Sequence, residues 1–107
     1  MNKKINKILN KKSKSRIVSL TAYSKNIAKI LDKYVDIVLV GDSVANVLYA
    51  HKNTHQISLD NIIQHSISVK QGVKKSLLVV DMPLGSYKNS KIAKKNAQII
   101  LRKTKCD

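Results

Sequence analysis

The amino-acid sequence predicts an α/β fold built on a small parallel sheet, and three observations lead to it. Short apolar runs alternate with helical patterns along residues 16–107. These runs are continuously apolar, which is typical of strands covered on both faces. A chain of 107 residues forms one domain at most. Strands that alternate with helices indicate parallel pairing through crossover connections.

The elements of the first half follow a basic beginning. Residues 1–15 are rich in Lys and Asn, and we expect a basic tail or short helix there, outside the domain at 16–107. The apolar run Ile17–Leu20 predicts a first strand, and residues 37–40 (IVLV) predict a second. Ser24 is placed to cap a helix between them. The apolar face of that helix consists of Ile27, Ala28, Ile30, Leu31 and Tyr34.

The second half begins with a stretch, residues 43–57, that we expect to be irregular. Ser58 then caps a longer helix, and Gly72 is placed to end it as a glycine just beyond the last turn. Residues 77–80 predict the third strand. A third helix begins at Asn89 or Ser90 and continues through residue 100.

The composition narrows the class of partner. The formal net charge is +15, but nearly all of the positive charge is Lys, and the only aromatic residues are four Tyr. A nucleic-acid site would favour Arg forks and aromatic stacking, so the basic character indicates a bias of composition more than a nucleic-acid partner. No apolar run is long enough to span a membrane. The single cysteine, Cys106, allows no intrachain disulfide and favours a reducing cytoplasm.

Two aspartates occupy the position where parallel α/β proteins bind ligands. Asp42 follows the second predicted strand, and Asp81 follows the third. Ligands bind beyond the carboxyl ends of such strands, and paired carboxylate oxygens suit Mg²⁺. The alternative for each aspartate taken singly is a turn or a helix cap. Ser43 is placed to donate its hydroxyl or backbone N–H to an anionic substrate, or else to cap the next turn.

Other chemically active residues carry weaker signals. His51 and His55 are four residues apart, but no Cys or carboxylate nearby completes a zinc set. His65 lies off the apolar stripe of its helix, which favours a hydrogen-bonding or packing role. Tyr23 and Tyr87 follow the first and third strands and either overhang the site or pack beside it. Cys106 has no base beside it, so it is not a candidate nucleophile.

Five linked segments carry a resemblance to a known family. They are LTAYS (20–24), VDIVLVGDS (35–43), ISLDNIIQH (57–65), VKQGV (69–73) and LLVVDMPLGSY (77–87). In this order and at these separations the sequence resembles the N-terminal third or more of the ketopantoate hydroxymethyltransferase family. The resemblance implies about three βα units of a TIM (β/α)₈ barrel.

The resemblance also implies an activity. Family enzymes transfer a hydroxymethyl group from 5,10-methylenetetrahydrofolate to 3-methyl-2-oxobutanoate, which gives 2-dehydropantoate on the route to pantothenate and coenzyme A. They are cytoplasmic homo-oligomers that bind Mg²⁺. Position by position, Asp42 and Asp81 match the metal-binding aspartates, which also lie near the keto acid, and Ser43 matches a serine that contacts the keto acid. Membrane and nucleic-acid partners are not implied.

The sequence departs from the family in one major respect. All six acidic residues are Asp, so the family's glutamate base and metal-associated glutamate are missing, and so is its substrate lysine. This chain therefore contains no catalytic residue of the family. Three strands of eight cannot close a barrel, so we expect a marginally folded or aggregating chain without turnover. The alternative function is a small basic α/β module that binds nucleic acid or an acidic partner.

Overall fold

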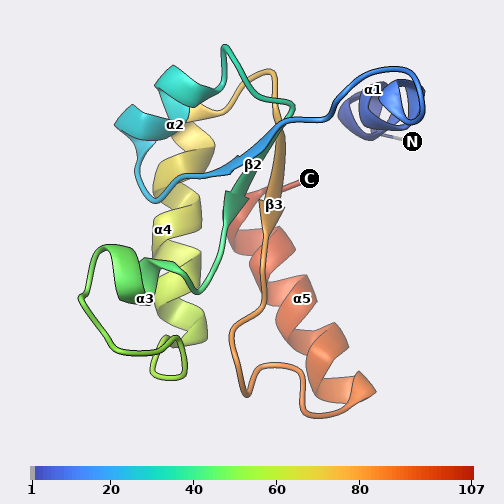
Figure 1. Ribbon diagram of the computed structural model, residues 1–107. Helices are drawn as coiled ribbons and strands as arrows, with labels where there is room; N and C mark the ends of the chain where they lie inside the picture. Colours follow the sequence, from blue (N-terminus) through green and yellow to red (C-terminus); the bar gives the residue numbers. More distant parts are fainter. Residues whose placement is uncertain (1) are drawn as a thin grey trace.

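The computed structural model describes residues 2–107, which form a three-stranded parallel sheet and five helices (Figure 1). The strand order is β1-β2-β3. The elements are α1 (Lys3–Lys11), β1 (Ser19–Thr21), α2 (Lys25–Leu31), β2 (Ile37–Val40), α3 (Val44–Val47), α4 (Leu59–Gly72), β3 (Leu77–Val80) and α5 (Ser90–Thr104). The predicted α/β class with a parallel sheet is confirmed. Among the described residues, no helix is long and apolar enough to cross a membrane.

Only one face of the sheet is covered. Val38, Val40 and Leu78 are fully buried and pack with residues of α2 and α4 in the main core. On the strands' other side, Leu20 is 48% exposed and Val79 is 37% exposed. The expectation that the strands are covered on both faces is therefore wrong, because no second layer of described residues lies over the open face.

The first strand and first crossover helix differ in detail from the prediction. Pairing places β1 at Ser19–Thr21, two residues later than the predicted start at Ile17. Ser24 is at the N-cap of α2, as expected, but its side chain makes no capping hydrogen bond. The predicted apolar face is largely exposed, since Ile27, Ile30 and Tyr34 are 50%, 58% and 76% exposed. Only Ala28 in α2 is buried, where the helix faces α4.

Helix α4 confirms its predicted beginning and corrects its predicted end. Ser58 and Asn61 form a complete capping box at the N-terminus. Gly72, however, is the last residue of the helix and not a left-handed residue beyond it. A Cβ at this position would lie 2.4 Å from the backbone oxygen of Lys25 and 2.8 Å from the backbone nitrogen of Lys29. The glycine is required because the backbones of α2 and α4 meet there.

Helices α3 and α5 complete the comparison between the predicted and the observed elements. The four-residue helix α3 lies within residues 43–57, which we had expected to be irregular. Its residues Val44 and Ala45 are fully buried, so packing and not helix length stabilises it. Asn89 caps α5 through a hydrogen bond from the backbone N–H of Ile92, as predicted.

The N-terminal end of the sheet is held by charged side chains. Lys11 of α1 forms a 2.7 Å ion pair with Asp36, which precedes β2. The hydrogen bond from Lys11 and that from the backbone N–H of Val18 hold the pKa of Asp36 below its ordinary value. In Figure 1, α1 accordingly lies at the end of the sheet where β2 and β3 begin. That end is opposite the predicted site.

A second carboxylate joins α2 to the start of β3. Asp32 is 8% exposed and accepts hydrogen bonds from the backbone N–H groups of Lys74, Lys75 and Ser76, at 2.8–3.1 Å. Burial alone would raise the pKa of Asp32, but these backbone hydrogen bonds outweigh it and lower the pKa. The carboxylate therefore supports the turn between α4 and β3.

Candidate active site

The two candidate metal ligands lie at the same end of neighbouring strands. Strands β2 and β3 pair in parallel with Val40 opposite Val80, and the backbone N–H of Asp81 donates to the oxygen of Val40 at 2.9 Å. Gly41 therefore stands opposite Asp81. A Cβ built on Gly41 would lie 3.8 Å from Oδ2 of Asp81, so this carboxylate lies beside the residue that precedes Asp42. The ends of β2 and β3 that carry the two aspartates therefore lie side by side, and the role of the pair as metal ligands stays a prediction.

The surroundings of the pair suit a cation with few protein ligands. Asp42 is half-buried and Asp81 is exposed, and neither takes part in the two ion pairs found within residues 2–107. Oδ1 of Asp81 accepts a hydrogen bond from the backbone N–H of Met82 at 2.9 Å. Across the described residues, no group of three or more His, Cys, Asp or Glu side chains gathers. Two hard oxygen donors suit Mg²⁺, which retains several waters, and do not suit a cation that needs a complete protein cage.

Ser43 has a partner that the sequence did not reveal. Its hydroxyl lies 2.6 Å from the hydroxyl of Tyr23, which follows β1. Although Ser43 is the N-cap residue of α3, its side chain makes no capping hydrogen bond. Tyr23, at the end of the neighbouring strand β1, therefore holds the Ser43 hydroxyl in place. Ser43 itself follows Asp42 directly in the chain. Tyr23 packs against the site, one of the two roles that its position allowed.

A hydrogen-bonded chain continues from Tyr23 into α4. Nδ1 of His65 lies 2.8 Å from the backbone oxygen of Tyr23, and Nε2 contacts the hydroxyl of Tyr49. A carbonyl oxygen only accepts, so Nδ1 of His65 donates. The hydrogen-bonding role expected for His65 is confirmed. Tyr49 was missed because it lies in the loop after α3, where no periodic pattern links it to a residue sixteen positions later.

Among the described residues, the side chains of the remaining candidates form no hydrogen bond with this chain of contacts. The ring of His51 lies 5.7 Å from that of Tyr49, and its Nδ1 is buried without a hydrogen-bond partner among the described residues. The backbone N–H of His55 donates to the side chain of Asn53. Tyr87 is 51% exposed. Cys106 packs at the edge of the main core.

Comparison with known proteins identifies the family. The family model described as ketopantoate hydroxymethyltransferase matches residues 2–107. The chain belongs to the ketopantoate hydroxymethyltransferase family. The resemblance carried by the GDS and DMP segments is therefore confirmed.

Named relatives agree with this assignment. Over 107 residues the chain is 59% identical to the 3-methyl-2-oxobutanoate hydroxymethyltransferase of Pelagibacter ubique, covering all of this chain and 42% of that protein. It is 49% identical over 92 residues to the enzyme of that name from Rhizobium etli, covering 85% of this chain and 34% of the relative. For Campylobacter fetus the identity is 46% over 104 residues, covering 96% and 39%.

The chain thus spans between about a third and two fifths of the length of the curated relatives it matches. All three relatives carry a transferase name. The comparisons give no support to the alternative of a basic module for nucleic acid or an acidic partner.

Proposed function

We propose that this chain is the metal- and keto-acid-binding part of a 3-methyl-2-oxobutanoate hydroxymethyltransferase, within the first three βα units of a TIM barrel. The reaction moves a hydroxymethyl group from 5,10-methylenetetrahydrofolate to 3-methyl-2-oxobutanoate in pantothenate biosynthesis, in the cytoplasm. The observation that carries the proposal is the placement of Asp42 and Asp81 at the carboxyl ends of paired strands. Family membership supplies the reaction.

Each site residue has a role that its contacts support. Asp42 and Asp81 would hold Mg²⁺ through their carboxylate oxygens. Ser43 donates a hydrogen bond to the keto acid, while its oxygen accepts one from the Tyr23 hydroxyl, which lies 2.6 Å away. When bound, the cation supplies positive charge that stabilises the negative charge developing on the keto acid as its C3 loses a proton.

Deprotonation itself needs a base that this sequence does not contain. None of its residues is Glu, and the two site aspartates are assigned to the metal. We therefore assign the base, a further metal ligand and the substrate lysine to the part of the relatives that this chain does not match. In this proposal the active enzyme is a homo-oligomer with complete barrels.

The surface beside β3 supports the need for more polypeptide. A largely apolar groove of about 250 Å³ lies between β3 and α5. Asp107 lies along the edge of β3, where its backbone N–H donates to the oxygen of Leu78 and its Oδ2 accepts from the N–H of Leu78. A fourth parallel strand placed there would cover the groove and continue the sheet toward barrel closure.

Turnover is expected only when that polypeptide is supplied. The purified chain should show no hydroxymethyl transfer above the uncatalysed rate. Co-expression with the unmatched remainder of the Pelagibacter ubique relative should restore Mg²⁺-dependent formation of 2-dehydropantoate, because the remainder brings the base to the same site. The assay follows 2-dehydropantoate by mass spectrometry.

Two controls make the assay decisive. Asp42→Asn in the complemented pair should reduce turnover by at least about 100-fold, whereas Asp60→Asn on the exposed face of α4 should leave it unchanged. Robust turnover by the chain alone would overturn the incomplete-site proposal. Equal activity of the Asp42→Asn and unsubstituted pairs would overturn the assigned role of the aspartate.

A further inference from the structure

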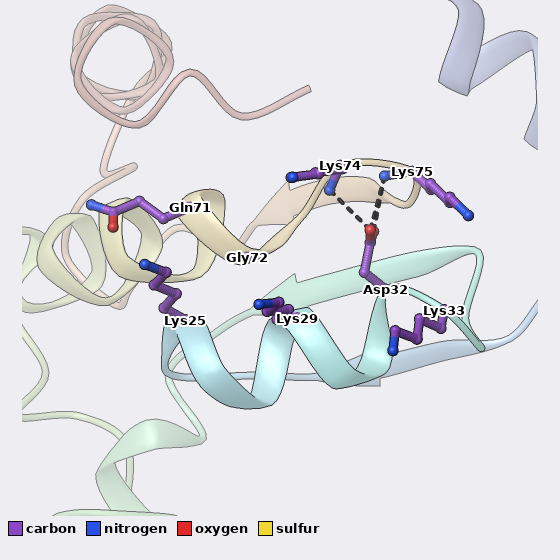
Figure 2. Close-up of a pocket in the computed structure, with 8 residues that line it drawn as sticks. All are labelled: Lys25, Lys29, Asp32, Lys33, Gln71, Gly72, Lys74 and Lys75. Carbon is purple, nitrogen blue, oxygen red and sulfur yellow. Dashed lines mark hydrogen bonds between the residues drawn. The ribbon is translucent and has the colours of Figure 1, made fainter.

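A second cavity, far from the aspartate pair, lies between α2, α4 and the turn before β3 (Figure 2). Its volume is about 410 Å³, within the range of small-molecule sites. It is lined by Lys25, Lys29, Asp32, Lys33, Gln71, Gly72, Lys74 and Lys75. Nothing in the proposed transferase function uses it.

The charge in this cavity is strongly unbalanced. Five lysines and one aspartate line it, and the aspartate already accepts hydrogen bonds from three backbone N–H groups. Neither ion pair found within residues 2–107 uses a lysine of the cavity. The C-terminal ends of α2 and α4 add about half a negative charge each. The residues that line the cavity therefore carry a surplus of about three positive charges.

Two contacts between distant segments shape the cavity. Gly72 lets the backbone of α4 approach that of α2, which brings Lys25 and Lys29 beside the end of α4. Asp32 accepts a hydrogen bond from the backbone N–H of Lys74. This bond holds the turn between α4 and β3 across from α2. In Figure 2 the side chains of Lys25, Lys29 and Lys74 extend toward the Gln71 side of the cavity. Three ammonium groups from separate segments thus border one space.

We propose that this cavity binds a small oligophosphate anion. Lysine ammonium groups act as point charges that bind phosphate oxygens from several directions, and the Gln71 amide adds a neutral donor. Several lysine ammonium groups are distributed around a cavity of about 410 Å³, and this arrangement suits linked phosphate groups better than a single phosphate. No aromatic residue lines the cavity, so it offers no surface on which nucleic-acid bases stack.

The test uses the 107-residue chain and inorganic tripolyphosphate at constant ionic strength. Tripolyphosphate should raise the urea midpoint, because a ligand that binds only the folded state stabilises it. Amide NMR shifts should concentrate in residues 25–33 and 71–75. The triple substitution Lys25→Ala, Lys29→Ala, Lys74→Ala should weaken binding about 30-fold, at about threefold for each exposed ammonium group.

A matched triple variant separates a site from general attraction to a basic chain. Lys91→Ala, Lys94→Ala, Lys95→Ala removes the same charge from the exposed face of α5 and should change the affinity less than twofold. The corresponding Lys→Gln triple in the cavity keeps more of each side chain and guards against misfolding. Equal weakening by both triples, or amide shifts spread over all helices, would show an adventitious ion only. Tighter binding of a short single-stranded DNA at the same residues would also overturn the proposal.

Discussion

Replacing Gly72 by alanine is expected to unfold much of the chain. In an ordinary helix this change stabilises by about 0.5–1 kcal/mol, because alanine restricts the unfolded chain more than glycine does. Here the new Cβ would lie 2.4 Å from the backbone oxygen of Lys25, and a backbone atom cannot move aside as a side chain can. We expect a loss of about 2–4 kcal/mol in the free energy of unfolding, since α2 and α4 must separate.

Urea unfolding followed by circular dichroism measures this loss. Gly41→Ala is the matched control, because its Cβ would meet only ordinary contacts at 3.7 Å and beyond. The free energy of unfolding of this control should stay within about 0.5 kcal/mol of that of the original chain. A Gly72→Ala variant as stable as the original chain would contradict the close approach of the two helices.

Removing the Asp32 carboxylate is expected to have the second-largest effect on folding. Asp32→Ala leaves the N–H groups of Lys74, Lys75 and Ser76 without their acceptor, and Ser76 is itself buried. We expect a loss of about 2–3 kcal/mol, in which the buried N–H of Ser76 accounts for most of the cost. Asp60→Ala, on the exposed first turn of α4, is the control and should cost less than about 1 kcal/mol.

The pH dependence of stability gives an independent reading of the same carboxylate. Because the folded pKa of Asp32 is lowered, its contribution is present above the ordinary aspartate pKa of about 3.9 and is lost as pH falls through the folded value. Asp36 and Asp107 have lowered pKa values as well. Stability should thus fall below about pH 4, and less steeply in Asp32→Ala. An unchanged acid profile in that variant would contradict the role of the carboxylate.

The elements that were predicted well are those whose signals are local. Ser58 and Asn89 cap their helices by accepting hydrogen bonds from backbone N–H groups three residues later in the chain. Such a cap can be recognised from a short stretch of sequence. Strands β2 and β3 coincide with the predicted apolar runs. The reason is that Val38 and Leu78 are buried on the covered face of the sheet, which requires apolar side chains there. The aspartates could be placed because parallel strands bring their carboxyl ends to one edge.

The elements that were missed depend on contacts between distant segments. Gly72 follows the pattern of a helix-ending glycine, and only the position of α2 shows that it serves close packing. The exposure of Ile27 and Ile30 depends on which elements pack against α2. The periodicity of the sequence carries no information about those elements. The contact between Tyr23 and Ser43 joins residues twenty positions apart across two strand ends. Pairing of that kind follows from strand order and side-chain direction together.

Binding of one divalent cation by two aspartates is most directly tested with Mn²⁺ as a paramagnetic probe on the 107-residue chain. Amide signals of residues 41–43 and 81–82 should broaden selectively, with a dissociation constant on the order of 1 mM because only two carboxylates contribute. Asp42→Asn and Asp81→Asn should each weaken binding more than about tenfold, and Asp60→Asn should not. Broadening that survives either site substitution, or that centres on another part of the chain, would contradict a shared cation at the ends of β2 and β3.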